Sequence, residues 1–475
     1  MSAQPPVFDV FVIGSGPAGQ KAAIGLAKGG LKVALCERMR QIGGACVHQG
    51  TIPSKALRER AVERGRVNER LSELGAPELD RATSIAELIG ETSEIMASHD
   101  AYITEQLARN GVEIVHGRAR FESASEVQVL TTTGQQQTYR AHKFVIAAGS
   151  RPRHPDEVGV DHEHIYDSDS VLSMAYLPES MVVLGGGVIA CEYASIFSVL
   201  GVDVTLIDRY PMPLGFLDQS LTERFMRSFK RRGGVFLGES EVVQCGFDGL
   251  SSVVTELSDG RQIRADKVLC AQGRIADLSN LNVEAVGLKL NERGLLDVDE
   301  FCQTQVPHIY AAGDVIGPPS LASASMEQGR QIACHILGYD IGTLGKVMPS
   351  GIYSIPELAS VGLTEAQAQR EFDQVVVGFS DFSEIARGHI ANAKDGMLKM
   401  VVDGDGVVRG VHVVGMHASD LVHIGQMGML HDATVDVYIE NVFNFPTYAE
   451  GYRVAAIDAA AKLAQLRATA PAQTG

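Results

Sequence analysis

The sequence predicts an α/β protein of several domains, and three observations lead to that prediction. First, a glycine-rich turn between an apolar run and a helix-like stretch occurs twice, at residues 14–19 and 185–190. Second, each turn is followed by another apolar run that ends in an acidic residue, Glu37 or Asp208, and that acid lies 23 positions after the first glycine in both copies. Third, the chain beyond residue 346 changes to alternating strand patterns followed by helices. This order favours two related units with parallel sheets and a C-terminal unit of α+β type.

Both turns match the fingerprint of dinucleotide-binding βαβ units. The first glycine permits a tight turn, the second lets a pyrophosphate approach the backbone, and a small third residue lets the helix pack closely. The pyrophosphate then lies at a helix N-terminus, and the later acid binds ribose hydroxyls. One match in a chain with 50 glycines is a weak signal, but two matches with equally spaced acids favour two dinucleotide sites and therefore redox chemistry. The fingerprint positions are Gly14, Gly16 and Gly19 in the first copy and Gly185, Gly187 and Ala190 in the second.

The bulk composition narrows the class of protein. A length of 475 residues predicts two to four domains, and 45% hydrophobic with 21% charged residues is typical of globular proteins. A net charge of −17 disfavours binding to nucleic acid or to anionic membranes. The chain has no apolar stretch long enough to span a membrane and no signal-like N-terminus. We therefore expect a cytoplasmic protein with neither a membrane nor a nucleic acid as partner.

Cysteine and histidine usage predicts no metal site. The seven cysteines are odd in number and form no C-x-x-C pair, which disfavours a disulfide scaffold or a zinc site. His412, His417 and His423 are spaced in a way that suits no metal.

The remaining segments follow in a clear order along the chain. A charged, helix-patterned stretch covers about 52–110, and a β-rich stretch at 112–149 ends in FVIAAGSRP. The second unit, 178–274, ends in the similar VLCAQGR, which is a further sign of duplication. An apolar run at 309–311 leads into a glycine turn with Asp314 at its tip. The residues Asp403–Gly406 between two apolar runs predict a hairpin.

The stretch GGACVHQGTIPSK at residues 43–55 resembles the flavin disulfide reductase family, which includes dihydrolipoamide dehydrogenase and glutathione reductase. With both fingerprints, the turn at Asp314 and the C-terminal segment PTYAE, the resemblance covers nearly the whole chain. It implies two Rossmann-like domains, one for FAD and one for NAD(P), and an α+β dimerisation domain. The expected limits are 1–155 and 277–346 for the FAD domain, 156–276 for the NAD(P) domain, 347–466 for the dimerisation domain and 467–475 for a disordered tail.

Two departures from the family pattern bear on the function. Disulfide reductases carry two cysteines separated by four residues, but here Cys46 is followed by Thr51 at the second position. They also carry a histidine before a C-terminal proline, and here that residue is Phe445, although Glu450 remains. Thiol–disulfide exchange needs a second sulfur and a group that carries the proton, and both are missing here. We therefore expect no disulfide reductase activity.

The same departures occur in the soluble transhydrogenase branch of the family, and the stretches GTIPSKALR, CEYASIF and FNFPTYAEGYRVAA resemble that branch. The resemblance implies ping-pong hydride exchange between NADPH and NAD+ through bound FAD, in a homodimer or a larger homo-oligomer.

The resemblance also implies roles for individual residues. Lys55 and Glu192 match a buried pair beside the reactive nitrogen of the flavin and are the expected catalytic groups. Asp208 suits the ribose 2′-hydroxyl of NAD, and Arg209 partly offsets its repulsion of a 2′-phosphate. Glu37 is expected to bind the FAD ribose, and Asp314 the ribityl chain. The other expected cofactor-binding residues are Gly44, Cys46, Gly149 and Ala322 for FAD and Gly273 and Arg274 for the nicotinamide nucleotide.

Two other functions remain open on the sequence. One is an NADH-specific diaphorase that reduces quinones or dyes, which Asp208 would suit. The other is a non-catalytic flavoprotein that responds to the nucleotide ratio. A chemical role for Cys46 is also open, although a lone thiol that fills space is the favoured interpretation.

Overall fold

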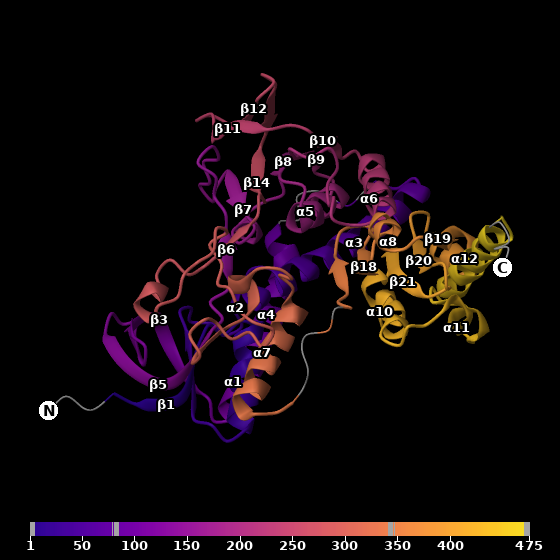
Figure 1. Ribbon diagram of the computed structural model, residues 1–475. Helices are drawn as coiled ribbons and strands as arrows, with labels where there is room; N and C mark the ends of the chain where they lie inside the picture. The colour runs from indigo at the N-terminus through magenta and orange to yellow at the C-terminus, as the bar shows by residue number, and fades with distance from the viewer. Residues whose placement is uncertain (1–4, 78, 80–84, 341–344, 346, 470–475) are drawn as a thin grey trace, which may run out of the picture.

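The computed structural model describes residues 5–77, 79, 85–340, 345 and 347–469. Three sheet-based units follow one another in space (Figure 1). The N-terminal segment and residues 277–337 share the first unit, the middle of the chain forms the second, and the C-terminal segment forms the third. The predicted α/β class and the α+β character of the last unit are confirmed.

The first unit is built on a parallel sheet in the order β16-β5-β1-β2-β3, and β4 joins β3 and β5 in antiparallel fashion. Helices α1 and α7 pack together closely because Gly25 and Gly329 carry no side chain at their contact. The elements are β1 Val7–Ile13, α1 Pro17–Lys28, β2 Val33–Glu37, α2 Gly44–His48, α3 Thr51–Glu73, α4 Ile85–Arg109, β3 Glu113–Ser123, β4 Glu126–Thr131, β5 Gln136–Ile146, β16 Ile309–Ala311 and α7 Ala322–Leu337.

The second unit repeats the parallel arrangement, with strand order β10-β9-β8-β14-β7 and a small antiparallel sheet β11-β12-β13. The chain enters and leaves this unit through β6 and β15, which pair with each other. The domain limits expected at 155 and 276 remain predictions. The elements are β6 Ser150–Pro152, β7 Ile165–Asp167, β8 Ser180–Leu184, α5 Val188–Val199, β9 Asp203–Ile207, α6 Gln219–Arg231, β10 Val235–Leu237, β11 Val242–Phe247, β12 Val253–Leu257, β13 Gln262–Ala265, β14 Lys267–Cys270 and β15 Arg274–Ala276.

The third unit has an antiparallel sheet in the order β17-β18-β21-β20-β19. The predicted hairpin is confirmed, since β20 and β21 pair on either side of Asp403–Gly406. Of the predicted tail, residues up to Thr469 belong to α12, and 470–475 lie outside the described residues. The elements are β17 Ser350–Ile352, β18 Leu358–Gly362, α8 Glu365–Glu371, β19 Val375–Asp381, α9 Ala386–Ala391, β20 Met397–Asp403, β21 Val408–Val414, α10 Ala418–Met429, α11 Val435–Glu440 and α12 Glu450–Thr469.

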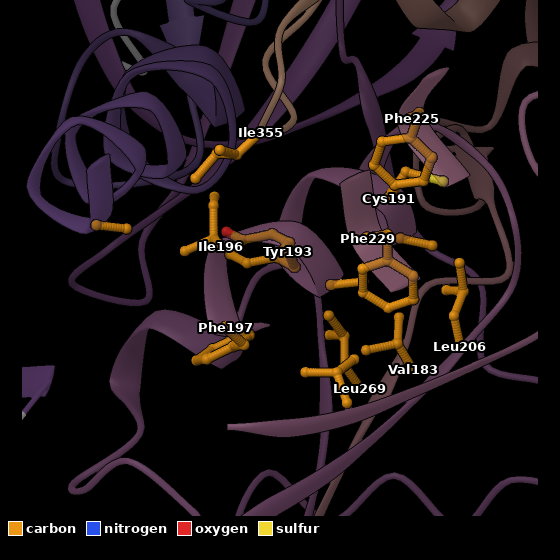
Figure 2. Close-up of a cluster of buried hydrophobic side chains, with 14 of the residues drawn as sticks. Val183, Cys191, Tyr193, Ile196, Phe197, Leu206, Phe225, Phe229, Leu269 and Ile355 are labelled. Atoms are coloured by element: carbon orange, nitrogen blue, oxygen red, sulfur yellow. The ribbon is translucent and has the colours of Figure 1, made fainter. Parts of the chain in front are cut away.

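The hydrophobic core of the second unit is shared with both of its neighbours. Figure 2 shows part of it, with Ile196 and Tyr193 of α5 near Ile355 of the third unit. Leu57 of α3 belongs to the same buried cluster. Because burial of apolar side chains drives folding, this shared core fixes the second unit against the other two. Among the described helices, none is long and apolar enough to cross a membrane.

Candidate functional site

A single cavity of about 1890 Å³ connects the first and second units. Both glycine turns open into it, and so do the acids that follow them, Glu37 and Asp208. Nearly all of the predicted site residues line this cavity. The exceptions are Gly19 and Ala190, which lie one turn inside α1 and α5 and serve helix packing.

The first glycine turn leaves its backbone open to a ligand. Gly14 has a φ of +105°, and a side chain there would collide with the carbonyl of Ala147. By contrast, the position of a Cβ on Gly16 has no other atom within 4 Å. Gly44 lies across the turn, where a Cβ would come within 2.9 Å of the Gly16 Cα. The free N-terminus of α1 therefore faces open space of the kind that a pyrophosphate occupies.

Glu37, at the end of β2, is buried and braces the first turn. Its Oε2 accepts hydrogen bonds from the amide and hydroxyl of Ser15, at 3.0 and 2.6 Å, and its Oε1 accepts from the Met39 amide at 2.9 Å. The carboxylate is therefore held rigidly at the cavity wall, where a ribose hydroxyl is expected. Sequence reasoning missed Ser15, although it lies inside the fingerprint.

The second turn repeats this geometry with one difference. Gly185 has a φ of +106°, and the Cβ position of Gly187 again has no atom within 4 Å. The residue equivalent to Ser15 is Gly186, which lies against the Asp208 carboxylate and offers it no hydroxyl. Burial raises the pKa of Asp208, while the backbone amides of the next two residues and the Arg209 charge lower it. Asp208 is thus less completely bonded within the protein than Glu37.

Arg209 lies beside Asp208 at the mouth of the cavity. Its guanidinium is 5.1 Å from the centre of the exposed Tyr210 ring, and both residues line the cavity. The structure thus places a cation next to the acid, as the sequence suggested.

Lys55 and Glu192 meet between the two turns. The Lys55 Nζ is 2.7 Å from Glu192 Oε2, and the two residues come from α3 of the first unit and α5 of the second. The Glu192 side chain is only 6% exposed, against 26% for Lys55, so the ammonium faces the cavity. The nearby ammonium partly offsets the cost of burying the Glu192 carboxylate.

Cys46 lies at the cavity wall with Thr51 as its neighbour. All seven cysteines are free, and burial raises the pKa of the Cys46 thiol, although hydrogen bonding with Thr51 and the charge of Lys55 act in the opposite direction. A thiol with a raised pKa is a poor nucleophile at neutral pH. Within the described residues, no group of three or more His, Cys, Asp or Glu side chains is arranged to hold a metal.

Asp314 and Arg274 are joined through a residue that sequence reasoning missed. The Ser150 hydroxyl donates to Asp314 Oδ2 at 2.5 Å and accepts from Arg274 Nε at 2.9 Å. Arg274 also forms an ion pair with Asp169 at 2.7 Å. Its guanidinium therefore ties the crossing strands to the second unit as well as lining the cavity. Nothing in the sequence near Ser150 marks it, since its partners lie more than 100 residues away.

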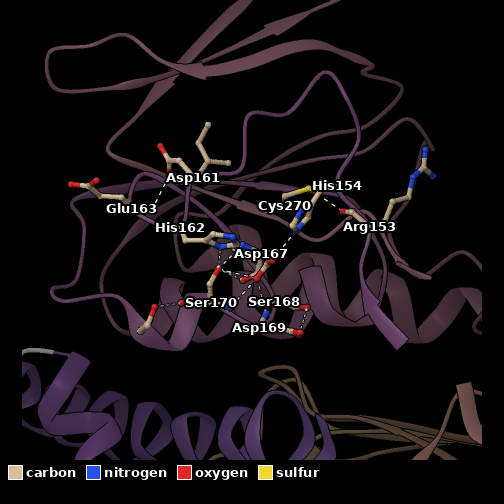
Figure 3. Close-up of polar contacts among 12 residues, drawn as sticks. Arg153, His154, Asp161, His162, Glu163, Asp167, Ser168, Asp169, Ser170 and Cys270 are labelled. Carbon is tan, nitrogen blue, oxygen red and sulfur yellow. Dashed lines mark hydrogen bonds and ion pairs between the residues drawn. The ribbon is translucent and has the colours of Figure 1, made fainter. Parts of the chain in front are cut away.

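Asp169 is held by the turn that follows β7. Figure 3 shows the Asp167 carboxylate at the centre of this turn, where it accepts from His154 Nε2 at 2.7 Å and from the amides of Asp169 and Ser170. These bonds lower the pKa of Asp167 despite its burial. A fixed turn places Asp169 in position for Arg274.

The remaining predicted residues lie at the ends of the elements that surround the cavity. Gly149 and Gly273 have φ values of +74° and +105° and flank the paired strands β6 and β15. Ala322 begins α7 at the cavity wall.

The first half of the cavity fits FAD. It offers an open helix N-terminus at Gly16, a braced carboxylate at Glu37 and a further carboxylate at Asp314. The second half offers an open helix N-terminus at Gly187 and a carboxylate at Asp208 for a second dinucleotide. The fold and site together define a two-nucleotide oxidoreductase.

The comparison with protein families supports this class of oxidoreductase. Residues 8–329 match the pyridine nucleotide-disulphide oxidoreductase model, and residues 348–456 match the dimerisation domain of the same family. The chain belongs to the pyridine nucleotide-disulphide oxidoreductase family, a family of FAD flavoproteins. Its dimerisation domain indicates a homo-oligomer.

Curated relatives indicate which branch of the family the chain resembles. A soluble pyridine nucleotide transhydrogenase from Azotobacter vinelandii is 42% identical over 458 residues, covering 95% of this chain and 98% of the relative. One from Marinomonas sp. is 40% identical, with 95% and 98% covered, and one from Mycobacterium bovis is 40% identical, with 97% and 98% covered. The resemblance to the transhydrogenase branch is therefore confirmed.

Solved structures share the fold. LpdA from Mycobacterium tuberculosis superimposes with a TM-score of 0.87 at 25% identity, covering 94% of this chain and 99% of that one. The HOCl-induced flavoprotein disulfide reductase RclA from Escherichia coli, as a Cu(II) complex, also gives 0.87 at 25% identity, with 95% and 99% covered.

Proposed function

We propose that this protein transfers a hydride between NADPH and NAD+ by way of bound FAD. The observation that carries the proposal is the single cavity lined by both glycine turns, with Lys55 and Glu192 between them. Transhydrogenases at 40–42% identity over nearly the whole chain support it.

The flavin ring supplies the hydride chemistry, since it accepts and returns two electrons with a proton. The residues of the chain supply position and charge. The turn at Gly16, with Glu37 and Asp314, holds FAD, and the turn at Gly187 with Asp208 holds the nicotinamide nucleotide. Lys55 presents an ammonium at the cavity and Glu192 fixes it, so negative charge that develops nearby is stabilised without reorganisation.

We further propose ping-pong exchange at one nicotinamide site. With FAD on the first turn, only the second turn remains, so one nucleotide must leave before the other binds. Cys46 takes no part as a redox disulfide, because its neighbour Thr51 has no sulfur and burial raises the pKa of its own thiol.

Steady-state kinetics tests both statements. With NADPH as donor and thio-NAD+ as acceptor, double-reciprocal plots should be parallel, and each nucleotide should compete with the other. Absence of turnover would refute the proposed activity. Intersecting plots without competition would refute the single site.

A second candidate is an NADH-specific diaphorase, which the Asp208 carboxylate favours because it repels a 2′-phosphate. Turnover of NADH with a quinone, but not of NADPH with thio-NAD+, would select it. We also propose a homodimer, on the basis of the dimerisation domain, and a cytoplasmic location, on the basis of the composition.

A further inference from the structure

Residues 353–357, here called the crossing segment, connect β17 to β18 and lie between helices of the other two units. On the α5 side, the Tyr353 amide donates to Glu192 Oε1 at 2.8 Å and the Ile355 amide donates to Ser195 Oγ at 3.0 Å. The third unit therefore positions the Glu192 carboxylate, and this carboxylate in turn pairs with Lys55. Three units of the chain meet at one ion pair.

The crossing segment is equally fixed on the α3 side. Arg58, one helical turn after Lys55, donates from Nε to the Ser354 carbonyl at 3.3 Å and pairs with Glu357 at 3.2 Å. Ser354 is fully buried. The backbone at Tyr353 thus has little freedom to move relative to Lys55.

The Tyr353 side chain is directed by this backbone to the cavity wall. The Lys55 Nζ lies 5.0 Å from the centre of the Tyr353 ring, and both residues line the cavity. The ammonium has the Glu192 carboxylate 2.7 Å away and the Ser54 hydroxyl 3.3 Å away, and the aromatic ring is a further neighbour. An aromatic face attracts a cation through its quadrupole, and the attraction grows as water is excluded.

We propose that Tyr353 is a positioning residue for hydride transfer, which fixes Glu192 through its amide and holds the Lys55 ammonium at the cavity through its ring. This inference rests on the proposed function, in which Lys55 faces the flavin. A cation held close to the flavin favours reduction, because the reduced form gains negative charge. Without the ring, the Lys55 ammonium becomes more hydrated and more mobile, and reduction of the flavin becomes less favourable.

Titration of the FAD-loaded protein against a redox dye of known potential tests the inference. At a fixed potential, Tyr353→Leu should lower the ratio of reduced to oxidised flavin about threefold to tenfold, and tenfold corresponds to about 30 mV for two electrons. Tyr353→Phe keeps the ring and should stay close to wild type.

Tyr176→Leu is the matched control, since Lys267 Nζ also lies 5.0 Å from the Tyr176 ring but that pair does not line the cavity. It should leave the ratio unchanged. If Tyr353→Leu does not accumulate as folded FAD-loaded protein, Tyr353→Met, which keeps more of the side-chain length, takes its place under the same criteria.

The double variant with Lys55→Met separates positioning from general structure. If the ring acts through the ammonium, Tyr353→Leu should have no further effect on the ratio in the Lys55→Met background. An unchanged ratio in Tyr353→Leu, an equal fall in Tyr353→Phe, or a full additive effect in the double variant would each overturn the inference. The dye titration needs no nicotinamide turnover. Lack of NADPH-to-NAD+ transfer by the wild type therefore overturns the proposed function alone.

Discussion

Glu37 and Asp208 occupy equivalent positions but have different surroundings. Glu37 is bonded by both the amide and the hydroxyl of Ser15, whereas Asp208 lies against Gly186 and has a raised pKa. A hydroxyl in one turn and its absence in the other thus fix the Glu37 carboxylate more firmly in place than the Asp208 carboxylate.

Replacing Asp208 with Asn should shift the preference toward NADPH. The change removes one repulsive charge near the expected 2′-phosphate, and the shift in relative kcat/KM should be on the order of 1 kcal/mol, or about fivefold. Asp203, an exposed acid at the start of β9, the strand that ends just before Asp208, provides the control variant Asp203→Asn. An unchanged ratio of kcat/KM for NADH and NADPH in Asp208→Asn would place the carboxylate away from the ribose.

Cys46→Ser should retain most NADPH-to-NAD+ transfer. The thiol has Thr51 rather than a second sulfur as its neighbour, and burial raises its pKa. Steady-state rates of NADPH-to-NAD+ transfer by the wild type and by Cys46→Ser provide the measurement. A loss of more than about a hundredfold, or about 2.7 kcal/mol of barrier, would assign the thiol a chemical role.

At the scale of elements, the two strand–turn–helix units should be separable by mutation. Gly16 and Gly187 both leave open space at a helix N-terminus, so a larger side chain at either would enter the volume meant for a pyrophosphate. Gly16→Val should lose FAD. Gly187→Val should keep FAD but raise the KM for both nicotinamide nucleotides. Flavin absorbance of the purified variants and their kinetics provide the measurements, and loss of FAD in Gly187→Val would contradict the assignment of the two turns.

These elements also show what the sequence reveals and what it hides. The turns at Gly14 and Gly185 were predictable because their chemistry depends on residues close together in the chain, and the Lys55–Glu192 pair was predictable from family resemblance. The contacts of Ser150 and Tyr353 were not, because the partners of Ser150 are 124 and 164 residues away and that of Tyr353 is 161 residues away. Side chains whose role depends on a meeting of distant segments leave no local pattern.

At the scale of the whole molecule, a buried charge cluster joins the second and third units. Lys399 Nζ lies 2.8 Å from Asp218 Oδ1, at the start of α6, and 2.6 Å from Glu365 Oε2. His412 is fully buried, with its Nε2 3.9 Å from Asp218 Oδ2 and 3.0 Å from the Leu363 carbonyl. These contacts, with the shared core, keep the second unit fixed on the third.

This cluster predicts acid sensitivity. Burial lowers the pKa of His412 from 6.5 to about 4, although Asp218 and Glu365 oppose this while Lys399 adds to it. Asp218, despite its burial, has a lowered pKa because of His412 and Lys399. The unfolded chain therefore binds a proton at His412 before the folded chain does, and stability falls as pH drops from about 6.5 to about 4.

The contribution of His412 to this loss should not exceed about 3 kcal/mol. Urea unfolding of the FAD-loaded protein at several pH values measures it. His412→Gln should flatten the profile between pH 6.5 and 4 relative to wild type. The exposed His423→Gln should leave the profile unchanged. A His412→Gln profile as steep as that of wild type would exclude His412 as the cause.

The contrast between Ser15 and Gly186 has a practical side. The first turn, braced by Ser15, suits a cofactor that stays bound. The second turn, which has Gly186 at that position, suits nucleotides that bind and dissociate. We expect the protein to remain yellow through dialysis and chromatography while nicotinamide nucleotides wash out. Immobilised on a solid support, it would need no flavin in the feed, and a flowing stream could then carry only the two nucleotides whose balance is to be adjusted.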